Sequence, residues 1–394
     1  MKFSHLLLTC LSVIALSACG DKNDGPDKPD VPDVPKVQRD TMVFAVGEEP
    51  VAGQTYYYAT IWHDGKAIHI SDGTYDSYCN GAAIAGNVLY VVGNEATGDL
   101  VDDGYYEPYK SNVGVMWTID LNDFDPDAPK VSKMALSDGK HETSALKVAV
   151  ADSKVYVCGS DYVENGNRRA IVWADGKAVY LTDGSVDALP YCIAADGGDY
   201  YAGGYIQSSE NKSLGTAVIW KNGEVTKLTD GSTLAKVSAI SVYTDKSGKK
   251  HVLAAGSEKV NGGRWKGVLW IDGKAQDLTA EEGTSIAAMS ATDEGYYIVG
   301  NKTIDATGSI VVCLWTKDGC SVLSKNDGST IEGTALALAG DEVYVVGSEA
   351  KLDTSTYDYV FKPHVWINGV EKDFNLSEGT TIWSMASGVV EKQL

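Results

Sequence analysis

Basic residues are scarce in this sequence. Its 394 residues include 33 Lys and Arg against 54 Asp and Glu, which gives a net charge of -21 and a pI of about 4.6. Nucleic acids and anionic membrane surfaces both require a basic face, so the composition argues against either as a partner. The negative charge is of the kind that keeps an exported protein soluble.

Motifs of known catalytic and metal sites are also missing. The cysteines show no C-x-x-C pair or zinc-like spacing, and the histidines show no H-x-H or H-E-x-x-H spacing. There is no G-x-S-x-G elbow and no Asp-box, and DLVDDG at 99–104 lacks the residue order of an EF-hand loop. The sequence therefore assigns no catalytic residue, no metal and no cofactor.

The longest apolar run lies at the N-terminus, from Leu6 to Leu16, and is too short to cross a membrane as a helix. Lys2 precedes it and small residues follow it, which is the form of a secretory signal. LSAC at 16–19 resembles the lipobox of bacterial lipoproteins. That resemblance implies a signal peptide at 1–18 and a lipid on Cys19. An ordinary signal peptide with a cysteine nearby is the alternative.

The segment that follows is rich in Pro and Asp and has almost no large apolar residues. It cannot bury a core, so residues 19–40 are predicted to be an extended tether. Asp21 and Asp24, close to Cys19, resemble the export signal of surface lipoproteins in gut-dwelling Gram-negative anaerobes. This implies an outer-membrane lipoprotein exposed at the cell surface, with an anchor facing the periplasm as the alternative. The membrane is then a partner only through the lipid on Cys19.

From about residue 41 the chain repeats one pattern seven times. Each copy has a β-branched or aromatic run closed by Gly, such as LYVVG at 89–93, and then a second apolar run that ends in Trp. These tryptophans recur every 45–56 residues: Trp62, Trp117, Trp173, Trp220, Trp270, Trp315 and Trp366. In six copies Asp-Gly or Asn-Gly follows, a strong hairpin signal because a type I′ turn needs two positive φ angles. An acidic residue with Gly then marks a further turn.

Four strands per roughly 50 residues predict an all-β fold, a seven-bladed β-propeller with four antiparallel strands per blade, over residues 41–394. Helical periodicity is absent. The chain enters on the second strand of a blade, and TIWSMASGVV at 381–390 is a first strand with no successor. The C-terminal strand, Thr381–Val389, is therefore predicted to pair with Met42–Gly47 and complete the N-terminal blade.

The repeated residues are interpreted as structural. The tryptophans are expected to pack between blades, the acidic-Gly pairs to form turns, and the cysteines after Cys19 to be mainly buried. The pattern A-x-x-W-x-x-G-x-x-x-x-L resembles HAF-type extracellular repeats and, more loosely, kelch repeats. That resemblance implies the fold and export, and it implies no reaction.

The long, varied loops between second and third strands, and between blades, share one face of the predicted ring, where function is expected. Trp383 is not a repeat tryptophan. Counted back without gaps from the turns between first and second strands, it falls where Tyr191, Asn80, Ala287 and Thr334 fall in other blades, near the channel mouth. The candidate ligand-binding residues on this face are Trp383, Tyr191, Asn80, Tyr78, Tyr105, Tyr106, Tyr109, Tyr357, Tyr359, Asp102 and Asp103. Flat aromatics among Asp and Asn suit sugar rings, whereas tyrosines that only fill loop interiors are the alternative.

These patterns favour a monomeric, lipid-anchored module that binds carbohydrate or a protein partner through its long-loop face. A glycan hydrolase or lyase on the same fold is the second hypothesis, with Asp99, Asp102, Asp103 or Glu107 as acid and base. The missing motifs favour binding over catalysis. A ring that only docks a structural partner is not separated from the first hypothesis by the sequence.

Overall fold

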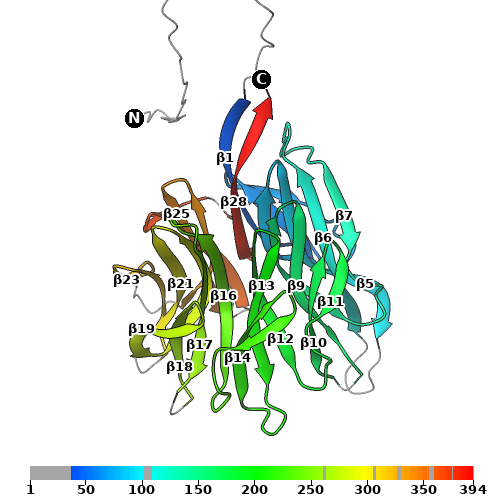
Figure 1. The fold of residues 1–394 in the computed structure, drawn as a ribbon. Coiled ribbons are helices and arrows are strands. Elements are labelled where there is room, and N and C mark those ends of the chain that lie inside the picture. The colour runs from blue at the N-terminus through cyan, green and yellow to red at the C-terminus, as the bar shows by residue number, and fades with distance from the viewer. Residues whose placement is uncertain are drawn as a thin grey trace, which may run out of the picture.

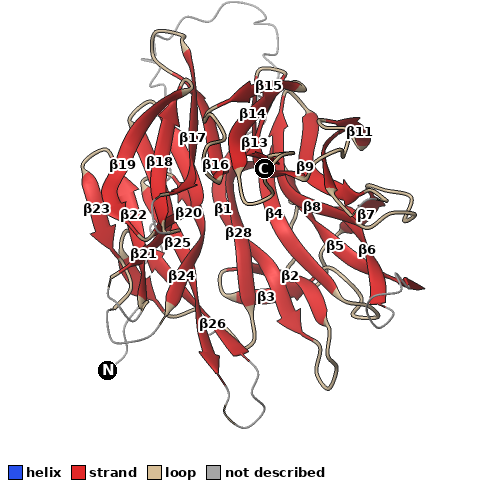
Figure 2. Ribbon diagram, turned by 90° about the horizontal axis from the view of Figure 1, so that it is seen from below, coloured by secondary structure: helices blue, strands red, loops and turns tan. Residues whose placement is uncertain are grey.

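The computed structural model describes residues 37–101, 109–164, 166–260, 263–304, 308–325, 330–352, 354, 359–374 and 376–393. Within these ranges every regular element is a β-strand, and no helix could cross a membrane. The strands form seven four-stranded antiparallel sheets. Each innermost strand contacts the innermost strands of its two neighbours, so the sheets close into a ring (Figures 1 and 2). The predicted seven-bladed β-propeller is confirmed.

Each blade has its four strands in the same order, from the channel outward. Blade 1 contains β28 (Thr381–Gln393), β1 (Val37–Pro50), β2 (Tyr57–His63) and β3 (Lys66–His69). Blade 2 contains β4 (Ser77–Ala85), β5 (Val88–Val101), β6 (Tyr109–Asp120) and β7 (Val131–Ala135). Blade 3 contains β8 (Thr143–Ala151), β9 (Lys154–Tyr162), β10 (Arg168–Ala174) and β11 (Lys177–Tyr180). Blade 4 contains β12 (Ala188–Asp196), β13 (Asp199–Gln207), β14 (Gly215–Lys221) and β15 (Glu224–Lys227).

The remaining three blades follow this order as well. Blade 5 contains β16 (Ala235–Thr244), β17 (Lys250–Lys259), β18 (Trp265–Ile271) and β19 (Lys274–Glu282). Blade 6 contains β20 (Thr284–Thr292), β21 (Gly295–Thr303), β22 (Ile310–Thr316) and β23 (Gly319–Val322). Blade 7 contains β24 (Ile331–Ala339), β25 (Glu342–Leu352), β26 (Tyr359–Ile367) and β27 (Val370–Lys372).

Blade 1 joins the two ends of the described chain. β28 pairs with β1 from Val37–Gln393 to Glu48–Thr381, which confirms the predicted closure. Strand β1 begins at Val37 and so includes residues 37–40 of the segment predicted to be a tether. The β1–β28 ribbon rises beyond the ring on the side of the short turns between first and second strands (Figure 1). There the Asn87 side chain accepts the Glu391 N–H at 2.9 Å.

The repeat tryptophans are interior residues, as predicted. All seven are at most 4% exposed. They pack with residues of the adjoining blades; Trp117 of blade 2, for example, shares a cluster with Phe44 of blade 1. Four of the five described cysteines are buried, and Cys320 is exposed. The periodic residues therefore hold blade against blade.

The Asp-Gly and Asn-Gly dipeptides form the predicted turns in five blades. Asn222 and Gly223, for example, have φ angles of 50° and 91°. Blade 6 differs, because Thr316 pairs with Gly319 and the turn residues are Lys317 and Asp318. The prediction of an Asp-Gly turn was wrong there, because the turn keeps its distance from the repeat tryptophan while Asp318-Gly319 lies one residue later in the sequence.

Four of the acidic-Gly pairs are confirmed as turns, because the carboxylates of Asp72, Asp138, Asp183 and Asp230 each accept the backbone N–H two residues later. Glu282 instead ends strand β19, and Asp327 and Gly328 lie outside the described residues.

The sequence suggested that a glycine ends each second strand, but the strands continue past this glycine. Strand β5, for example, continues through Gly93 to Val101. A β-bulge in the innermost strand lies beside this glycine, and a Cβ on Gly93 would lie 1.9 Å from the Tyr78 carbonyl oxygen. Glycine is needed there because the bulge presses the neighbouring backbone against it.

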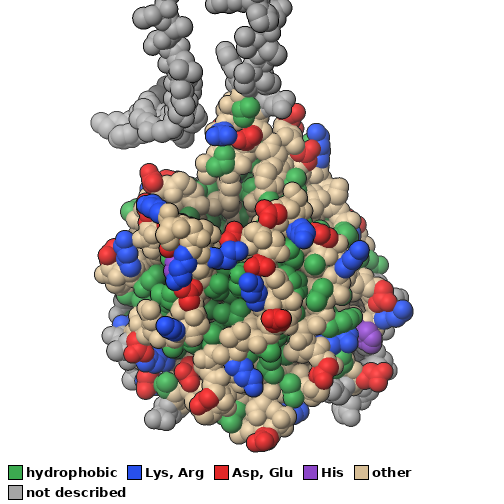
Figure 3. Space-filling view, in the orientation of Figure 1, with side chains coloured by type: hydrophobic (Ala, Val, Ile, Leu, Met, Phe, Trp, Pro, Cys, Tyr) green, Lys and Arg blue, Asp and Glu red, His purple; other side chains and the backbone are tan. Residues whose placement is uncertain are grey.

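The surface carries charges of both signs. On the side of the ring shown in Figure 3, basic and acidic side chains alternate around smaller apolar areas. Although acidic residues outnumber basic ones in the sequence, this side of the ring also exposes positively charged side chains.

Candidate functional site

A ring of bulge residues lies at one end of the channel. In every innermost strand two consecutive residues stand opposite one residue of the second strand, so one residue is unpaired. These residues, in blades 1 to 7, are Trp383, Asn80, Leu146, Tyr191, Ser238, Ala287 and Thr334. A bulge redirects its side chain. The predicted equivalence of Trp383, Tyr191 and Asn80 is confirmed, because each stands at the bulge near the start of its innermost strand.

In blades 2 and 6, the residue after the strand glycine links neighbouring blades. The Asn94 Oδ1 accepts the Ala145 N–H at 3.2 Å, and the Asn301 Oδ1 accepts the Gly333 N–H at 2.7 Å. Both acceptors reach the backbone just before the bulge of the next blade. Glu48 occupies the equivalent position in blade 1, so it brings a carboxyl group to the rim of the mouth.

Trp383 and Glu48 lie together in blade 1. The Trp383 residue is 42% exposed. Burial raises the pKa of Glu48 to about 7; hydrogen bonding with Trp383 and Thr381 opposes this, and the charge of Asp76 adds to it. Burial also raises the pKa of Tyr78 to about 12, with further repulsion from Asp76, Glu142 and Glu48. This side of the mouth is therefore aromatic and acidic.

The titration of Glu48 makes stability depend on pH. Its pKa is about 7 in the fold, above its ordinary 4.5. The contribution of Glu48 to stability is therefore greatest below pH 4.5 and is lost as the pH rises through 7. Glu48→Gln stays neutral, so we expect it to be more stable than the wild type by about 2 kcal/mol at pH 8, and about equal at pH 4.5. Urea unfolding at both values measures this difference. Equal differences at the two pH values would contradict it.

Asn80 and Lys147 fasten the bulges of blades 1 to 3. The Asn80 Nδ2 donates to the Ala145 carbonyl at 2.9 Å. The Lys147 ammonium donates to the bulge carbonyls of Asn80 and, at 3.0 Å, Trp383. Burial lowers the pKa of Lys147 to about 8. Asn80 thus holds the blade interface, and its predicted contact with a ligand stays a prediction.

Tyr191 is part of a second aromatic group in blades 3 to 5. Its ring stacks on Tyr205 at 6.0 Å, and the Lys236 ammonium lies 5.0 Å from its centroid. The Asp187 carboxylate accepts from Tyr205 and, on both oxygens, from Arg168. Burial alone would raise the pKa of Asp187, but these hydrogen bonds lower it to about 2. This side of the mouth is therefore aromatic and basic.

Of the other predicted residues, Tyr359 alone has a side chain that the structure describes. Tyr359 begins β26 and is 64% exposed. Tyr109 begins β6, but its side chain, like that of Asp99, lies outside the described part. Tyr105, Tyr106, Tyr357, Asp102, Asp103, Glu107 and Cys19 lie outside the described residues. The predictions for these residues remain predictions.

Four residues of the mouth were missed by the sequence interpretation: Glu48, Lys147, Lys236 and Trp265. Lys147 and Lys236 interrupt innermost strands that are otherwise rich in Ala and Ser. Trp265 stands five residues before a repeat tryptophan, outside the pattern. These departures from the repeat were the available signals. The signal for Glu48 was weaker, because the equivalent position after the strand glycine holds Asn, Ser or Tyr in the other blades.

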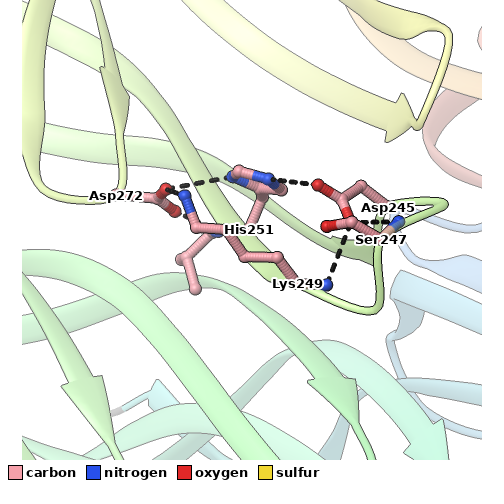
Figure 4. Close-up of polar contacts among 6 residues, drawn as sticks. Asp245, Ser247, Lys249, His251 and Asp272 are labelled. Carbon is pink, nitrogen blue, oxygen red and sulfur yellow. Dashed lines mark hydrogen bonds and ion pairs between the residues drawn. The ribbon is translucent and has the colours of Figure 1, made fainter.

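The opposite face carries a separate polar cluster in blade 5 (Figure 4). The His251 Nδ1 lies 3.0 Å from Asp272 and its Nε2 lies 3.2 Å from Asp245. Hydrogen bonds from Ser247 and from the Lys249 N–H lower the pKa of Asp245. The cluster joins the 245–249 loop to the outer turn at Asp272. In the part of the chain that the structure describes, no group of His, Cys, Asp and Glu is arranged to hold a metal ion.

A hollow of about 400 Å³ lies away from the mouth, between blades 2 and 3. Arg169 lines it, bonded through two nitrogens to the buried Asp161 and lying 3.8 Å from the ring centroid of Tyr180. Its main charged groups are thus already paired with each other, and the hollow offers a ligand less than the mouth does.

Comparison with known proteins gives structural similarities only. No protein-family model and no curated protein matches the chain. The acylaminoacyl peptidase of Pyrococcus horikoshii is 14% identical with a TM-score of 0.42, over 76% of this chain and 52% of that one. The β-propeller domain of the trilobed protease of Pyrococcus furiosus is 11% identical with a TM-score of 0.35, over 76% and 99%. A Trypanosoma rangeli sialidase is 10% identical with a TM-score of 0.42, over 71% and 52%.

The chain thus spans about half the length of the two enzymes among these structures. The assignment of the fold rests on the order and pairing of the strands described above.

Proposed function

We propose that this protein is an extracytoplasmic binding module that takes a carbohydrate at the long-loop mouth of its channel. The observation that carries the proposal is the contrast between Trp383 and the repeat tryptophans. Trp383 is 42% exposed on a bulge at the mouth, whereas the repeat tryptophans are at most 4% exposed. An indole face that packing does not use is available to a sugar ring.

The surroundings of Trp383 support a carbohydrate over an apolar ligand. Glu48 places a carboxyl group against the indole through a hydrogen bond with Trp383, and carboxyl groups hydrogen-bond to sugar hydroxyls. Tyr191 stands three blades away along a ring of seven, so it lies across the mouth. Two aromatic groups on opposite sides suit an extended saccharide. A protein partner at the same face is the competing ligand.

One observation favours glycan hydrolysis as a second candidate function. The pKa of Glu48 is about 7, raised mainly by burial and in part by the charge of Asp76, and a protonated carboxyl that feels a second carboxylate is what a general acid pair requires. Release of shortened products from a bound glycan by the wild type, and not by Glu48→Gln, would establish it. Binding without products favours the module.

The anchor is proposed to hold the mouth away from the membrane. The chain enters the ring at Val37, on the side of the ribbon, and the bulges lie at the opposite end of β28 (Figure 1). A lipid on Cys19 followed by a tether would attach at this far side, at the outer membrane and on the cell surface. The Cys19→Ser variant is expected to be found outside the membrane fraction even when no detergent is added. Retention of this variant in membranes would contradict the anchor.

Trp383→Ala is expected to reduce binding without unfolding the protein. An array of plant, microbial and host polysaccharides first identifies a glycan that the full chain binds. Loss of one aromatic stacking contact should then weaken binding about tenfold or more. The free energy of unfolding should change by less than about 1 kcal/mol, because the Trp383 side chain is partly exposed.

Trp366→Ala is the matched control, because Trp366 is 1% exposed in blade 7. We expect it to lower the free energy of unfolding by about 3–5 kcal/mol and to leave the affinity of the folded protein unchanged. A large loss of stability in Trp383→Ala with unchanged affinity would place Trp383 in the core and remove the site from the mouth.

A further inference from the structure

Lys236 occupies an unusual position at the mouth. It lies in β16, between the buried Ala235 and Val237. Its ammonium lies 5.0 Å from the ring centroid of Tyr191 and 5.5 Å from that of Trp265. Two aromatic rings therefore hold the charge, and burial lowers the pKa of Lys236.

A second lysine lies on the same indole. The Lys259 ammonium is 5.4 Å from the Trp265 ring. The two positive charges share one aromatic ring, and like charges so placed repel each other. Because aromatic rings attract cations without accepting their N–H groups as a carboxylate does, the donors of both lysines remain available.

Among the residues that the structure describes, no carboxylate pairs with Lys236 or Lys259. The nearby acids are bound to other groups: Asp187 to Arg168 and Tyr205, and Glu258 to the Thr233 hydroxyl at 2.6 Å. What distinguishes Lys236 and Lys259 from other lysines is that their ammonium groups lie close to one and the same indole ring.

We propose that the mouth selects saccharides that carry an anionic substituent, a carboxylate or a sulfate ester, and that Lys236 and Lys259 bind this group beside Trp265. The inference rests on the proposed binding of a carbohydrate and names its chemical class. Tyr191 and Trp265 supply the flat surfaces for the sugar ring, and the lysines supply the charge-assisted hydrogen bonds.

Affinity electrophoresis of the full chain tests this with matched polysaccharides. The probes are polygalacturonate, the same polymer with its carboxylates methyl-esterified, a sulfated galactan and a neutral galactan. We expect at least one anionic polymer to retard the protein about tenfold more strongly than its neutral counterpart. Polygalacturonate and the sulfated galactan distinguish the two sources of charge.

The variants separate charge recognition from folding. Lys236→Met is expected to lose the preference for the anionic polymer, and Lys236→Arg to keep most of it. Lys140→Met is the control, because this lysine is paired with Asp138 at 2.8 Å and its side chain is 78% exposed. Thermal melting checks each variant, and where Lys236→Met does not fold, Lys259→Met is expected to lose much of the preference because it removes the second charge beside Trp265.

The outcomes distinguish the two proposals. Equal binding of charged and neutral polymers, unchanged in Lys236→Met, overturns the anionic class and leaves carbohydrate binding in place. Inorganic sulfate that competes as strongly as the sulfated polymer shows a site for small anions and overturns the saccharide part. Retardation by none of the four polymers, together with an array on which no glycan binds, overturns the proposed function itself.

Discussion

Deletion of residues 380–394 is expected to abolish cooperative folding of the ring. The deleted strand β28 is the innermost strand of blade 1 and carries the buried Ile382, Ala386 and Val390. It also contacts the innermost strands of both neighbouring blades, β24 and β4. Its loss exposes the full edge of β1 and opens the ring at one position. We expect a cost of more than about 5 kcal/mol, which approaches the whole stability of a typical domain.

Circular dichroism melting measures this cost, and removal of residues 392–394 alone is the control. Lys392 and Gln393 pair with β1 at the end of the protruding ribbon, beyond the buried Val390. Their loss should cost less than about 1 kcal/mol. A 380–394 deletion that melts like the full chain would show that β28 does not close the ring.

Among glycine-to-alanine substitutions in blade 2, Gly93→Ala is expected to lower stability the most. The added Cβ would lie 1.9 Å from the Tyr78 carbonyl oxygen, so β4 and β5 must separate at the bulge. That separation would strain the bulge residue Asn80 and its link to Ala145. We expect a loss of about 3–4 kcal/mol in the free energy of unfolding, at the upper end for single substitutions.

Gly114→Ala is the matched control, because Gly114 pairs with Asn94 in the same blade. Its added Cβ would meet Ala145 at 3.4 Å, an ordinary contact. We expect its effect to stay within about 1 kcal/mol. Similar losses in the two variants, measured by urea unfolding, would mean that the bulge does not explain the glycine.

The sequence by itself determined the fold, because the signals of a propeller are local and repeated. Alternating apolar strands, the tryptophan that ends the third strand and the Asn-Gly or Asp-Gly turns each act within a few residues. Repetition set the number of blades, and the unmatched strand at 381–390 predicted the closure. The equivalence of Trp383, Tyr191 and Asn80 also followed, because the innermost strands align without gaps.

Only the tertiary structure decided what surrounds these residues. Glu48 meets Trp383 because the two ends of the chain pair in blade 1, and Lys236 meets Tyr191 because blade 5 packs on blade 4. The strand glycines proved to be places of close backbone approach, which a bulge in another strand imposes. Contacts of this kind join segments that are distant in the sequence. They depend on ring closure and on the bulges, and neither the spacing nor the composition of a single repeat specifies them.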